Sequence, residues 1–464
     1  MRTQDNGLSI RDFTGKTVFF SGIGGCSMNG LARILHAKGY RVLGSDRSES
    51  NYTQKLRQDG IKVFIGQREE NVRGADLLVY TAAVKPENPE RAYAAAHGIP
   101  QMDRATLLGQ ITREFRRVVG IAGCHGKTTI TSMVALMLEY GGVESTVHVG
   151  GDVAFLEGGT RVGKDNELFV TEACEYVESF LKLSPTTEVI HNIDDDHLDY
   201  YGDIGHIYDA FARYVALLPD DGMLFGCADD PMVMQLLSES NRPWATYGFG
   251  PDAHLRGHDI AYDQTGNPSF GCSVGGEPLF TASLNVPGRH NVMNALAAIS
   301  VARHLKVPDD AIVEALGAYT LTRRRFEHYG TVNGIHYYHD YAHHPSEIEA
   351  CLNAAKHTPH NRIWCIFQCN SYSRGKTLFD KYSRCFFNAD FVLVPDIYPG
   401  REQDKGLIHA RDLVRGISGS GKPCEYLPTF EDIRAYLLKY AEPEDLVLGV
   451  GSGDVYIQLR TIME

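Results

Sequence analysis

A glycine-rich loop between a predicted strand and a predicted helix, at Gly120–Thr129, constrains the fold of this chain most. The β-branched run Arg117–Val119 precedes the loop, and Ile130–Glu139 follows it with apolar residues at helical spacing. Strand, glycine loop and helix form the usual setting of a phosphate-binding loop, in which backbone N–H groups and a helix N-terminus face phosphate oxygens. Lys127 adds a positive charge, and Thr128 offers a hydroxyl to Mg²⁺. The glycines at 120, 123 and 126 depart from the general spacing, so a structural turn is the alternative.

Length, charge and cysteine usage restrict the class of protein. The chain has 464 residues, enough for two to four domains, and a net charge of −13. An acidic chain without a long Lys/Arg run is a poor candidate for binding nucleic acid or an anionic membrane. The ten cysteines are scattered singly, which is typical of reduced thiols. With no run of about 18 apolar residues, we expect a cytoplasmic protein without a membrane span.

The N-terminal region has the pattern of a dinucleotide-binding βαβ unit. Strand, glycine segment, helix and strand are predicted at Thr17–Ser21, Gly22–Gly30, Leu31–Lys38 and Arg41–Asp46. Asp46 ends the second strand, where an acid meets a ribose hydroxyl, and Thr81 follows a later strand at the same edge. Ser27 occupies the third glycine position, so a nucleotide site and tight strand–helix packing are equally open. An NAD-dependent oxidoreductase is one hypothesis, although the phosphate loop argues against it.

Two further α/β regions follow. Predicted strands at 167–171 and 188–193 deliver Glu172 and the run Asp194–Asp199 to strand ends, which favours a mostly parallel sheet. Residues 253–285 suggest antiparallel strands, and a helix is expected over Val292–His304. A third region begins near Arg323, with strands near 329–339, 363–368, 391–394 and 446–450. We place the domain boundaries near 114 and 323, giving domains 1–114, 115–323 and 324–464.

Several polar groups are candidates for chemistry. Glu172 can hold a Mg²⁺ that bridges two phosphates, and His197 could hold a second cation. We expect Asp194 and Asp195 to form a solvated acidic turn. Three further groups are predicted at element ends: Arg289–Asn291, which could bind phosphate or cap a helix; Arg323–Arg325, either a hinge cation or a solvated charge run; and Asp340 with His343 and His344 at a strand end.

The order of these motifs resembles that of the Mur ligases, the ATP-dependent amide ligases of peptidoglycan synthesis. The resemblance covers nearly the whole chain, and the family's own glycine spacing accounts for the unusual phosphate loop. The residues that carry it are Gly22–Gly25, Gly44–Asp46, Gly123–Thr129, Glu172–Glu175, Asn192–Ile193, Asp196–Asp199, His290–Asn294, Arg324–Phe326, Asp340–Pro345 and Tyr372–Arg374.

The resemblance implies a three-domain α/β fold: a Rossmann-like UDP-binding domain, a central P-loop ATPase domain with a mostly parallel sheet, and a C-terminal Rossmann-like domain. It implies ATP and Mg²⁺ as cofactors, and UDP-N-acetylmuramate and L-alanine as substrates. The substrate carboxylate attacks the γ-phosphate of ATP, and the amino group of L-alanine then attacks the resulting acyl phosphate. No nucleic-acid partner is expected, and the protein is expected to be a monomer or weak homodimer.

The resemblance also implies roles for individual residues. The catalytic set is Lys127, Arg325, His197 and Glu172, and the metal ligands are Thr128, Glu172 and His197. The ATP-binding set is Gly123, Cys124, His125, Gly126, Lys127, Thr128, Thr129, Asn192, His290, Asn291, Asn294, Arg325 and Asp340. The substrate-binding set is Gly22, Gly24, Gly25, Ser45, Asp46, Thr81, Tyr341, His343, His344 and Arg374, with Arg374 pairing the carboxylate of L-alanine.

Three departures from the family pattern keep alternatives open. Cys124 replaces the usual Thr of the loop, Cys174 replaces an acid, and Gln368–Ser371 lacks a Pro-His pair. A sister ligase that attaches a recycled murein tripeptide to the same nucleotide sugar is one alternative; Phe326 and the L-alanine-like pocket residues argue against it. A non-catalytic nucleotide-binding relative is another, supported only by the altered 369–371 segment.

Overall fold

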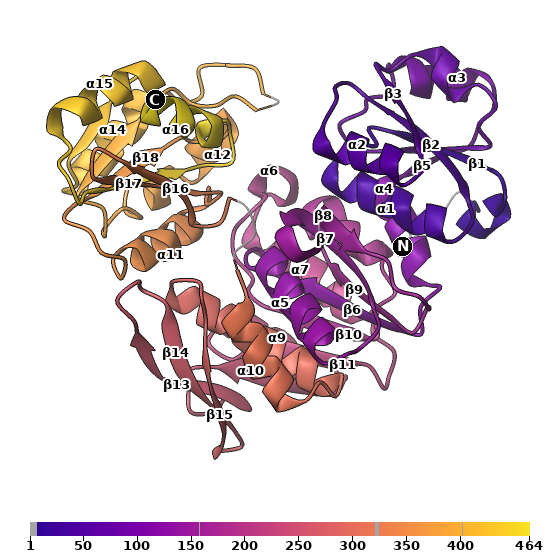
Figure 1. Ribbon diagram of the computed structural model, residues 1–464, viewed down its shortest axis with the longest axis horizontal. Coiled ribbons are helices and arrows are strands. Elements are labelled where there is room, and N and C mark those ends of the chain that lie inside the picture. Colours follow the sequence, from indigo (N-terminus) through magenta and orange to yellow (C-terminus); the bar gives the residue numbers. More distant parts are fainter. Residues whose placement is uncertain (1–6, 157, 321–323, 401) are drawn as a thin grey trace. The chain divides into compact units, whose positions relative to one another are not determined.

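The computed structural model describes residues 7–156, 158–320, 324–400 and 402–464 (Figure 1). The chain forms two compact units, one of residues 1–193 and 208–246 and the other of residues 194–207 and 247–464. Each unit spans more than one of the expected domains, so the boundaries near 114 and 323 remain predictions. All ten cysteines are described, and each is a free thiol. Among the described helices, none combines the length and apolar character needed to cross a bilayer.

The first unit begins with a five-stranded parallel sheet of order β3-β2-β1-β4-β5. β1 is entirely buried, as expected for the central strand of a sheet covered on both faces. The strands are β1 (Thr17–Ser21), β2 (Arg41–Asp46), β3 (Lys62–Ile65), β4 (Leu77–Tyr80) and β5 (Gln101–Asp103). The helices are η1 (Ile10–Phe13), α1 (Cys26–Ala37), α2 (Asn51–Gln58), η2 (Glu69–Val72), α3 (Pro89–Ala96) and α4 (Arg104–Thr112).

Helix α1 begins at Cys26, five residues before the predicted start at Leu31. Glycine within a helix is unfavourable by about 1 kcal/mol, which is why the sequence predicts a later start. Close packing outweighs this cost here. A Cβ on Gly30 would lie only 1.9 Å from the Thr160 hydroxyl oxygen, so only glycine allows the helix to approach so closely.

The second sheet of this unit has the strand order β12-β11-β10-β6-β9-β7-β8. The pairs β11-β10, β10-β6, β6-β9 and β9-β7 are parallel and β7-β8 is antiparallel, which confirms the mostly parallel sheet. The strands are β6 (Arg117–Ala122), β7 (Thr146–Val153), β8 (Gly158–Arg161), β9 (Leu168–Glu172), β10 (Thr187–Ile190), β11 (Met223–Cys227) and β12 (Trp244–Gly248). The helices are α5 (Lys127–Tyr140), η3 (Ala154–Leu156), η4 (Tyr176–Lys182), α7 (Ile204–Val215) and α8 (Pro231–Glu239).

The second unit contains an antiparallel meander, as predicted for residues 253–285, and a six-stranded sheet. The order of the latter is β16-β17-β21-β18-β19-β20, parallel except for β16. The strands are β13 (Leu255–Tyr262), β14 (Pro268–Val274), β15 (Glu277–Ser283), β16 (Glu327–Val332), β17 (Ile335–Asp340), β18 (Ile363–Phe367), β19 (Phe391–Val394), β20 (Cys424–Tyr426) and β21 (Leu446–Val450). The helices are α6 (Leu198–Tyr201), α9 (Arg289–His304), α10 (Asp309–Ala318), α11 (Pro345–Ala355), α12 (Tyr372–Thr377), α13 (Phe379–Tyr382), α14 (Ala410–Gly419), α15 (Phe430–Tyr440) and α16 (Val455–Met463).

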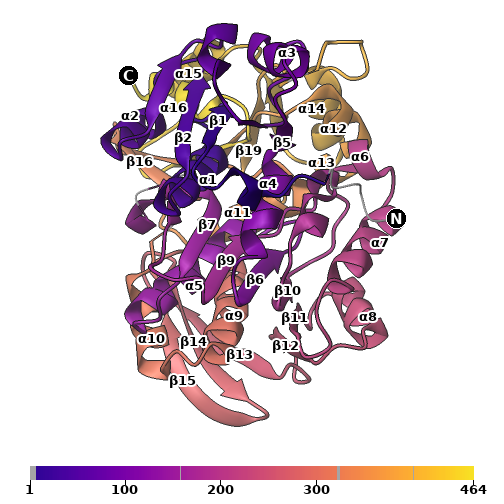
Figure 2. The ribbon, with the colours of Figure 1, turned by 90° about the vertical axis from the view of Figure 1, so that its right-hand side faces the viewer.

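Within the first unit, α1 lies against β7 of the second sheet (Figure 2). The hydroxyl oxygen of Ser27 is 2.9 Å from Nε2 of His148, and that of Thr160 is 2.9 Å from Nδ1. His148 is only 3% exposed. Burial, with a smaller contribution from Arg104, lowers the pKa of His148 to about 3. The imidazole is therefore neutral in the folded protein at neutral pH.

The free energy of unfolding is expected to fall by about 2 kcal/mol when the pH falls from about 7.5 to about 5, because His148 takes up a proton only in the unfolded chain. The pKa is about 6.5 in the unfolded chain and about 3 in the folded one, so between these values only the unfolded chain takes up the proton. Stability is therefore complete above pH 6.5 and declines as the pH falls. Urea denaturation of wild type and His148→Gln at both pH values measures the difference, because the variant keeps every other histidine. An equal pH dependence in the two proteins would contradict this prediction.

Candidate active site

The phosphate loop follows β6 at its carboxyl end and leads directly into α5. Gly126, the residue before the helix, has a φ of 82°, a left-handed conformation that favours glycine. The helix begins at Lys127 rather than near Ile130, so its first N–H groups belong to the loop motif itself. The side chain of Asn192 braces the loop. Its Oδ1 accepts a hydrogen bond from the backbone N–H of His125 at 2.9 Å, and its Nδ2 donates to the His125 carbonyl at 3.3 Å.

The ammonium group of Lys127 is turned back onto its own loop. Nζ donates to the carbonyls of Gly123 and Cys124 at 2.5 and 3.1 Å, and lies 2.8 Å from Oε2 of Glu175. Burial acts to lower the pKa of Lys127, but the adjacent Glu175 carboxylate outweighs it and the pKa is raised. Sequence reasoning did not assign a role to Glu175, which is 1% exposed. The available signal was a second acid three residues after Glu172.

Two of the three predicted metal ligands lie against neighbouring residues of β7. A Cβ on Gly150 would lie 2.9 Å from Oε2 of Glu172, and one on Gly151 would lie 2.9 Å from Cγ2 of Thr128. Oε1 of Glu172 also accepts the Gly150 N–H at 3.0 Å. A carboxylate and a hydroxyl beside a phosphate loop form the oxygen donor set that Mg²⁺ prefers, so these residues fit that ion.

The N-terminal glycine segment also gathers predicted residues. Gly24 N–H donates to Oδ2 of Asp46 at 2.8 Å, and a Cβ on Gly22 would lie 2.8 Å from Cγ2 of Thr81. Ser45 points elsewhere. It is fully buried, and its hydroxyl donates to Oε2 of Glu90 at 2.7 Å, within a cluster that includes Ser21 and Asn71. The Ser45 hydroxyl is therefore held by Glu90 at the end of its strand.

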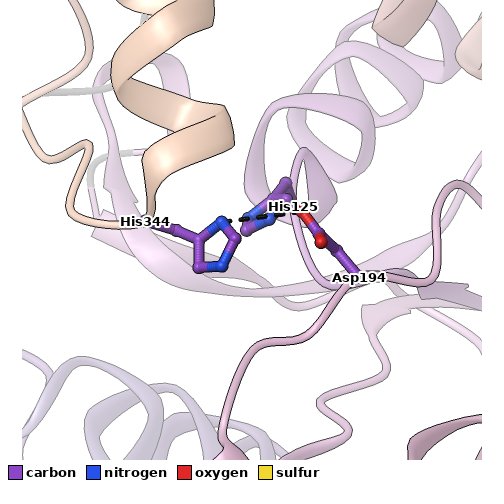
Figure 3. A group of neighbouring side chains, drawn as sticks. All are labelled: His125, Asp194 and His344. Carbon is purple, nitrogen blue, oxygen red and sulfur yellow. Dashed lines mark ion pairs between the residues drawn. The ribbon is translucent and has the colours of Figure 1, made fainter. Parts of the chain in front are cut away.

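In the second unit, the acidic turn at 194–196 pairs with cations of the chain, so the expectation of a solvated turn is wrong. Nδ1 of His344 lies 3.5 Å from Oδ2 of Asp194 (Figure 3). Nζ of Lys381 lies 2.5 Å from Oδ1 of Asp195. His344 is fully buried and caps α11, so its side chain supports the fold.

Asp196 makes the contact with the clearest chemical meaning in this turn. Its Oδ1 lies 3.0 Å from Nη2 of Arg374, the residue expected to bind a carboxylate, and both side chains are largely buried. The guanidinium therefore already has a carboxylate partner. His197 follows with a φ of 55°, its Nε2 3.8 Å from Oδ2 of Asp196, and 24% of its side chain exposed. It belongs to the second unit, whereas Glu172 and Thr128 belong to the first.

Arg325 and His343 lie beside Glu347. Nη1 of Arg325 is 3.8 Å from one Glu347 oxygen, and Nδ1 of His343 is 3.2 Å from the other. The Arg325 guanidinium also lies 5.6 Å from the ring centre of Tyr341. Burial, opposed by the charge of Glu347 and aided by that of Arg374, lowers the pKa of His343 to about 4. These four side chains form one polar cluster with a neutral imidazole.

Asp340 and the start of α9 make hydrogen bonds within the chain. Asp340 is buried and accepts the N–H groups of Phe326 and Ala342, both at 2.7 Å, and burial raises its pKa. Asn294 donates to Oδ1 of Asn291 at 3.1 Å, and Asn291 donates to the carbonyl of residue 287 at 2.7 Å.

The interpretation of residues 289–291 as a helix cap is wrong, because α9 begins at Arg289 and its cap position is Gly288. His290 lies exposed in this first turn. Arg323 lies outside the described residues. The altered segment before Arg374 is held in place from within the fold, since Gln368 donates to Asp454 at 2.7 Å and Glu402 accepts the Tyr372 and Ser373 N–H groups.

Comparison with known proteins identifies the family of this chain. Three family profiles match in order: "Mur ligase family, catalytic domain" over residues 17–116, "Mur ligase middle domain" over 121–302, and "Mur ligase, glutamate ligase domain" over 324–453. The UDP-N-acetylmuramate–L-alanine ligase of Acetivibrio thermocellus is 46% identical over 442 residues, 95% of this chain and 94% of that protein. The chain belongs to the Mur ligase family. The resemblance inferred from the motif order is thereby confirmed.

Other Mur ligases extend the comparison. The UDP-N-acetylmuramate–L-alanine ligase of Alkaliphilus metalliredigens is 44% identical over 448 residues, covering 97% of both proteins. The solved structure of a UDP-N-acetylmuramate–alanine ligase from Thermotoga maritima has a TM-score of 0.79 at 27% identity, covering 96% of this chain and 98% of that one. A murein peptide ligase from Psychrobacter arcticus has a TM-score of 0.69 at 25% identity, over 97% and 99%. The predicted three-domain α/β fold is confirmed.

Proposed function

We propose that this Mur ligase joins L-alanine to the carboxylate of UDP-N-acetylmuramate, in peptidoglycan precursor synthesis, with ATP converted to ADP and phosphate. The observation that carries the proposal is the identity of 46% over 95% of the chain to a ligase of that name. The tripeptide ligase is less favoured, because the two murein peptide ligases with this fold are 25% and 28% identical, against 46% and 44% for the two L-alanine ligases. A non-catalytic relative is disfavoured by the intact phosphate loop and its lysine.

The chemistry requires two anions to meet. The substrate carboxylate attacks the γ-phosphate of ATP, giving an acyl phosphate and ADP. The amino group of L-alanine then attacks the acyl carbon through a tetrahedral intermediate and releases phosphate. Cations must offset the charge that gathers at the phosphoryl group, and preorganised cations do so without reorganisation cost. Lys127 and Arg325 are assigned this role.

Thr128 and Glu172 are proposed to hold a Mg²⁺, which would offset phosphate charge when bound. For nucleotide binding, the loop Gly123–Thr129 supplies N–H donors, Asn192 fixes its shape, and His290 is a candidate contact. Gly22, Gly24, Gly25, Asp46 and Thr81 are proposed to hold the UDP-sugar. His197 as a second metal ligand, and Asn291, Asn294, Asp340, Ser45 and His344 as ligand contacts, rest on the family resemblance alone.

Arg374 is proposed to bind the carboxylate of L-alanine, with Tyr341 and His343 nearby. We propose three domains, formed by residues 1–114, 115–323 and 324–464. We propose a cytoplasmic enzyme, since its expected substrates are nucleotides, and a monomer or weak homodimer.

One assay tests the proposed function. The protein is incubated with ATP, Mg²⁺ and UDP-N-acetylmuramate, and phosphate release is measured with L-alanine, other amino acids and murein tripeptide. Release with L-alanine and little with tripeptide is expected. Release with tripeptide alone would establish the sister ligase, and the absence of phosphate release with every acceptor would favour the non-catalytic relative.

Replacing Arg374 by methionine is expected to raise the KM for L-alanine about 100-fold, since a buried charge-assisted bond is worth about 3 kcal/mol. The hydrophobic stem is retained, so the loss reports the guanidinium. Hydroxylamine, an acceptor without a carboxylate, serves as the control: its reaction with the acyl phosphate, measured as hydroxamate, is expected to change little. An equal loss with both acceptors would assign Arg374 to an earlier step.

A further inference from the structure

The Ser27 hydroxyl is a departure from the glycine pattern that the proposed function does not use. Instead of facing the nucleotide-sugar loop, it contacts β7 of the second sheet, 2.9 Å from Nε2 of His148. Arg104 donates to the same oxygen at 3.2 Å. On the other side of the ring, Nδ1 of His148 lies 2.9 Å from the Thr160 hydroxyl oxygen on β8. The hydroxyl thus links helices α1 and α4, beside the first sheet, to strands β7 and β8 of the second sheet.

Both ends of this contact lie next to a proposed ligand site. On one side, Ser27 stands in the first turn of α1, two residues after Gly25 of the nucleotide-sugar loop. On the other, His148 precedes Gly150 on β7 by two residues, and Gly150 N–H is the donor to Glu172. The Cys26 thiol reinforces the junction, since it donates to the Gly151 carbonyl at 3.4 Å.

The junction is close-packed. His148 is 3% exposed, both of its ring nitrogens have partners, and Gly30 of α1 leaves no space for even a methyl group against Thr160. A displacement of the α1 N-terminus when the glycine loop closes on a ligand would therefore pass to β7. Close-packed contacts of this kind transmit small movements because they cannot compress.

We propose that Ser27 and His148 form a positioning bridge that couples the nucleotide-sugar site to the Glu172–Thr128 edge of the ATP site. The proposal rests on the proposed function for the identity of the two ligands. Binding of UDP-N-acetylmuramate at the glycine loop would set the position of Gly150, and through it the carboxylate of Glu172. Both are positioning residues, because neither is assigned to a ligand.

The test is a linkage measurement by calorimetry. UDP-N-acetylmuramate is titrated into the full-length protein with and without a non-hydrolysable ATP analogue and Mg²⁺. We expect the analogue to tighten binding by about fivefold or more in the wild type. In Ser27→Ala and in His148→Leu, we expect this factor to fall below about twofold, while the affinity for each ligand alone stays within about twofold of wild type. The double variant should lose no more coupling than either single variant.

Asn166→Ala is the matched control. Asn166 is exposed, and its side chain accepts a hydrogen bond at 2.7 Å from Lys38, the residue just after α1. This contact joins the end of α1 to the residues before β9 of the second sheet, and not to β7. This variant should keep the wild-type factor. The proposal would be overturned if the coupling persisted in both bridge variants, or if the wild type showed no coupling. It would also be overturned if both variants lost their affinity for each ligand alone to the same extent as the coupling. A wild type that does not bind UDP-N-acetylmuramate at all would instead refute the proposed function.

Discussion

Replacing Lys127 by alanine is expected to lower the rate of ADP formation at least about 1,000-fold, while the affinity for UDP-N-acetylmuramate stays within about twofold of wild type. The lysine is the one full charge within the phosphate loop, whereas the proposed nucleotide-sugar residues lie on another sheet. Steady-state ADP release and calorimetric titration of the UDP-sugar measure the two quantities. An equal loss of both would mean that the two nucleotide sites are misassigned.

The lysine variant needs a folding control because it leaves Glu175 buried without its cation. Removing one partner of a buried pair costs about 3–5 kcal/mol, which could unfold the chain. The double variant Lys127→Met/Glu175→Gln removes both charges and is expected to restore thermal stability but not activity. Activity recovered in the double variant would show that the lysine is dispensable and that the single variant fails through Glu175.

Replacing Glu172 by glutamine is expected to lower turnover at least about 100-fold and to raise the Mg²⁺ concentration needed for half-maximal nucleotide binding about tenfold or more. The amide can still accept the Gly150 N–H, so the local fold should persist while the charge is lost. A fluorescent ATP analogue titrated with Mg²⁺ measures binding, and ADP release measures turnover. An unchanged Mg²⁺ requirement would remove Glu172 from the metal site.

Glu178→Gln provides the comparison for Glu172. Glu178 lies in the connection that follows β9 and Glu172, but its carboxylate pairs with Arg213 at 2.6 Å, on the surface. This variant is expected to keep turnover and Mg²⁺ dependence within about twofold of wild type, since exposed ion pairs contribute little. A large loss here would indicate that any charge change in the connection disturbs the loop.

Local patterns were sufficient for most of the architecture. The βαβ start, the phosphate loop between strand and helix, and the antiparallel region at 253–285 follow from residue periodicity and glycine placement, which depend on neighbours in sequence. Helix starts were less accurate. Both α1 and α9 begin earlier than predicted, at Cys26 and Arg289, since tertiary packing can outweigh helix propensity.

The directions of polar side chains could not be predicted in the same way. Ser45, Asp340 and His344 all end or follow strands, where ligands bind, yet each is buried and supports the backbone or a neighbouring side chain. A residue at a strand end can point to either face, and only the packing of distant segments decides which. The turn at 194–196 was misinterpreted for the same reason, because the partners of its carboxylates, Ser346 and Lys381 among them, lie some 150 to 190 residues away in sequence.

By itself, the sequence determined the family, the order of the sheets and the residues that form the phosphate loop, because these depend on local spacing and on motifs in a definite order. Only the tertiary structure showed that Lys127 is paired with Glu175, that Asn192 braces the loop, and that Arg374 meets Asp196. It also showed that Ser27, which stands at the third glycine position of the N-terminal pattern, contacts His148 of β7. Such pairings join residues far apart in the chain, and their partners are selected by burial and charge after the strands have assembled.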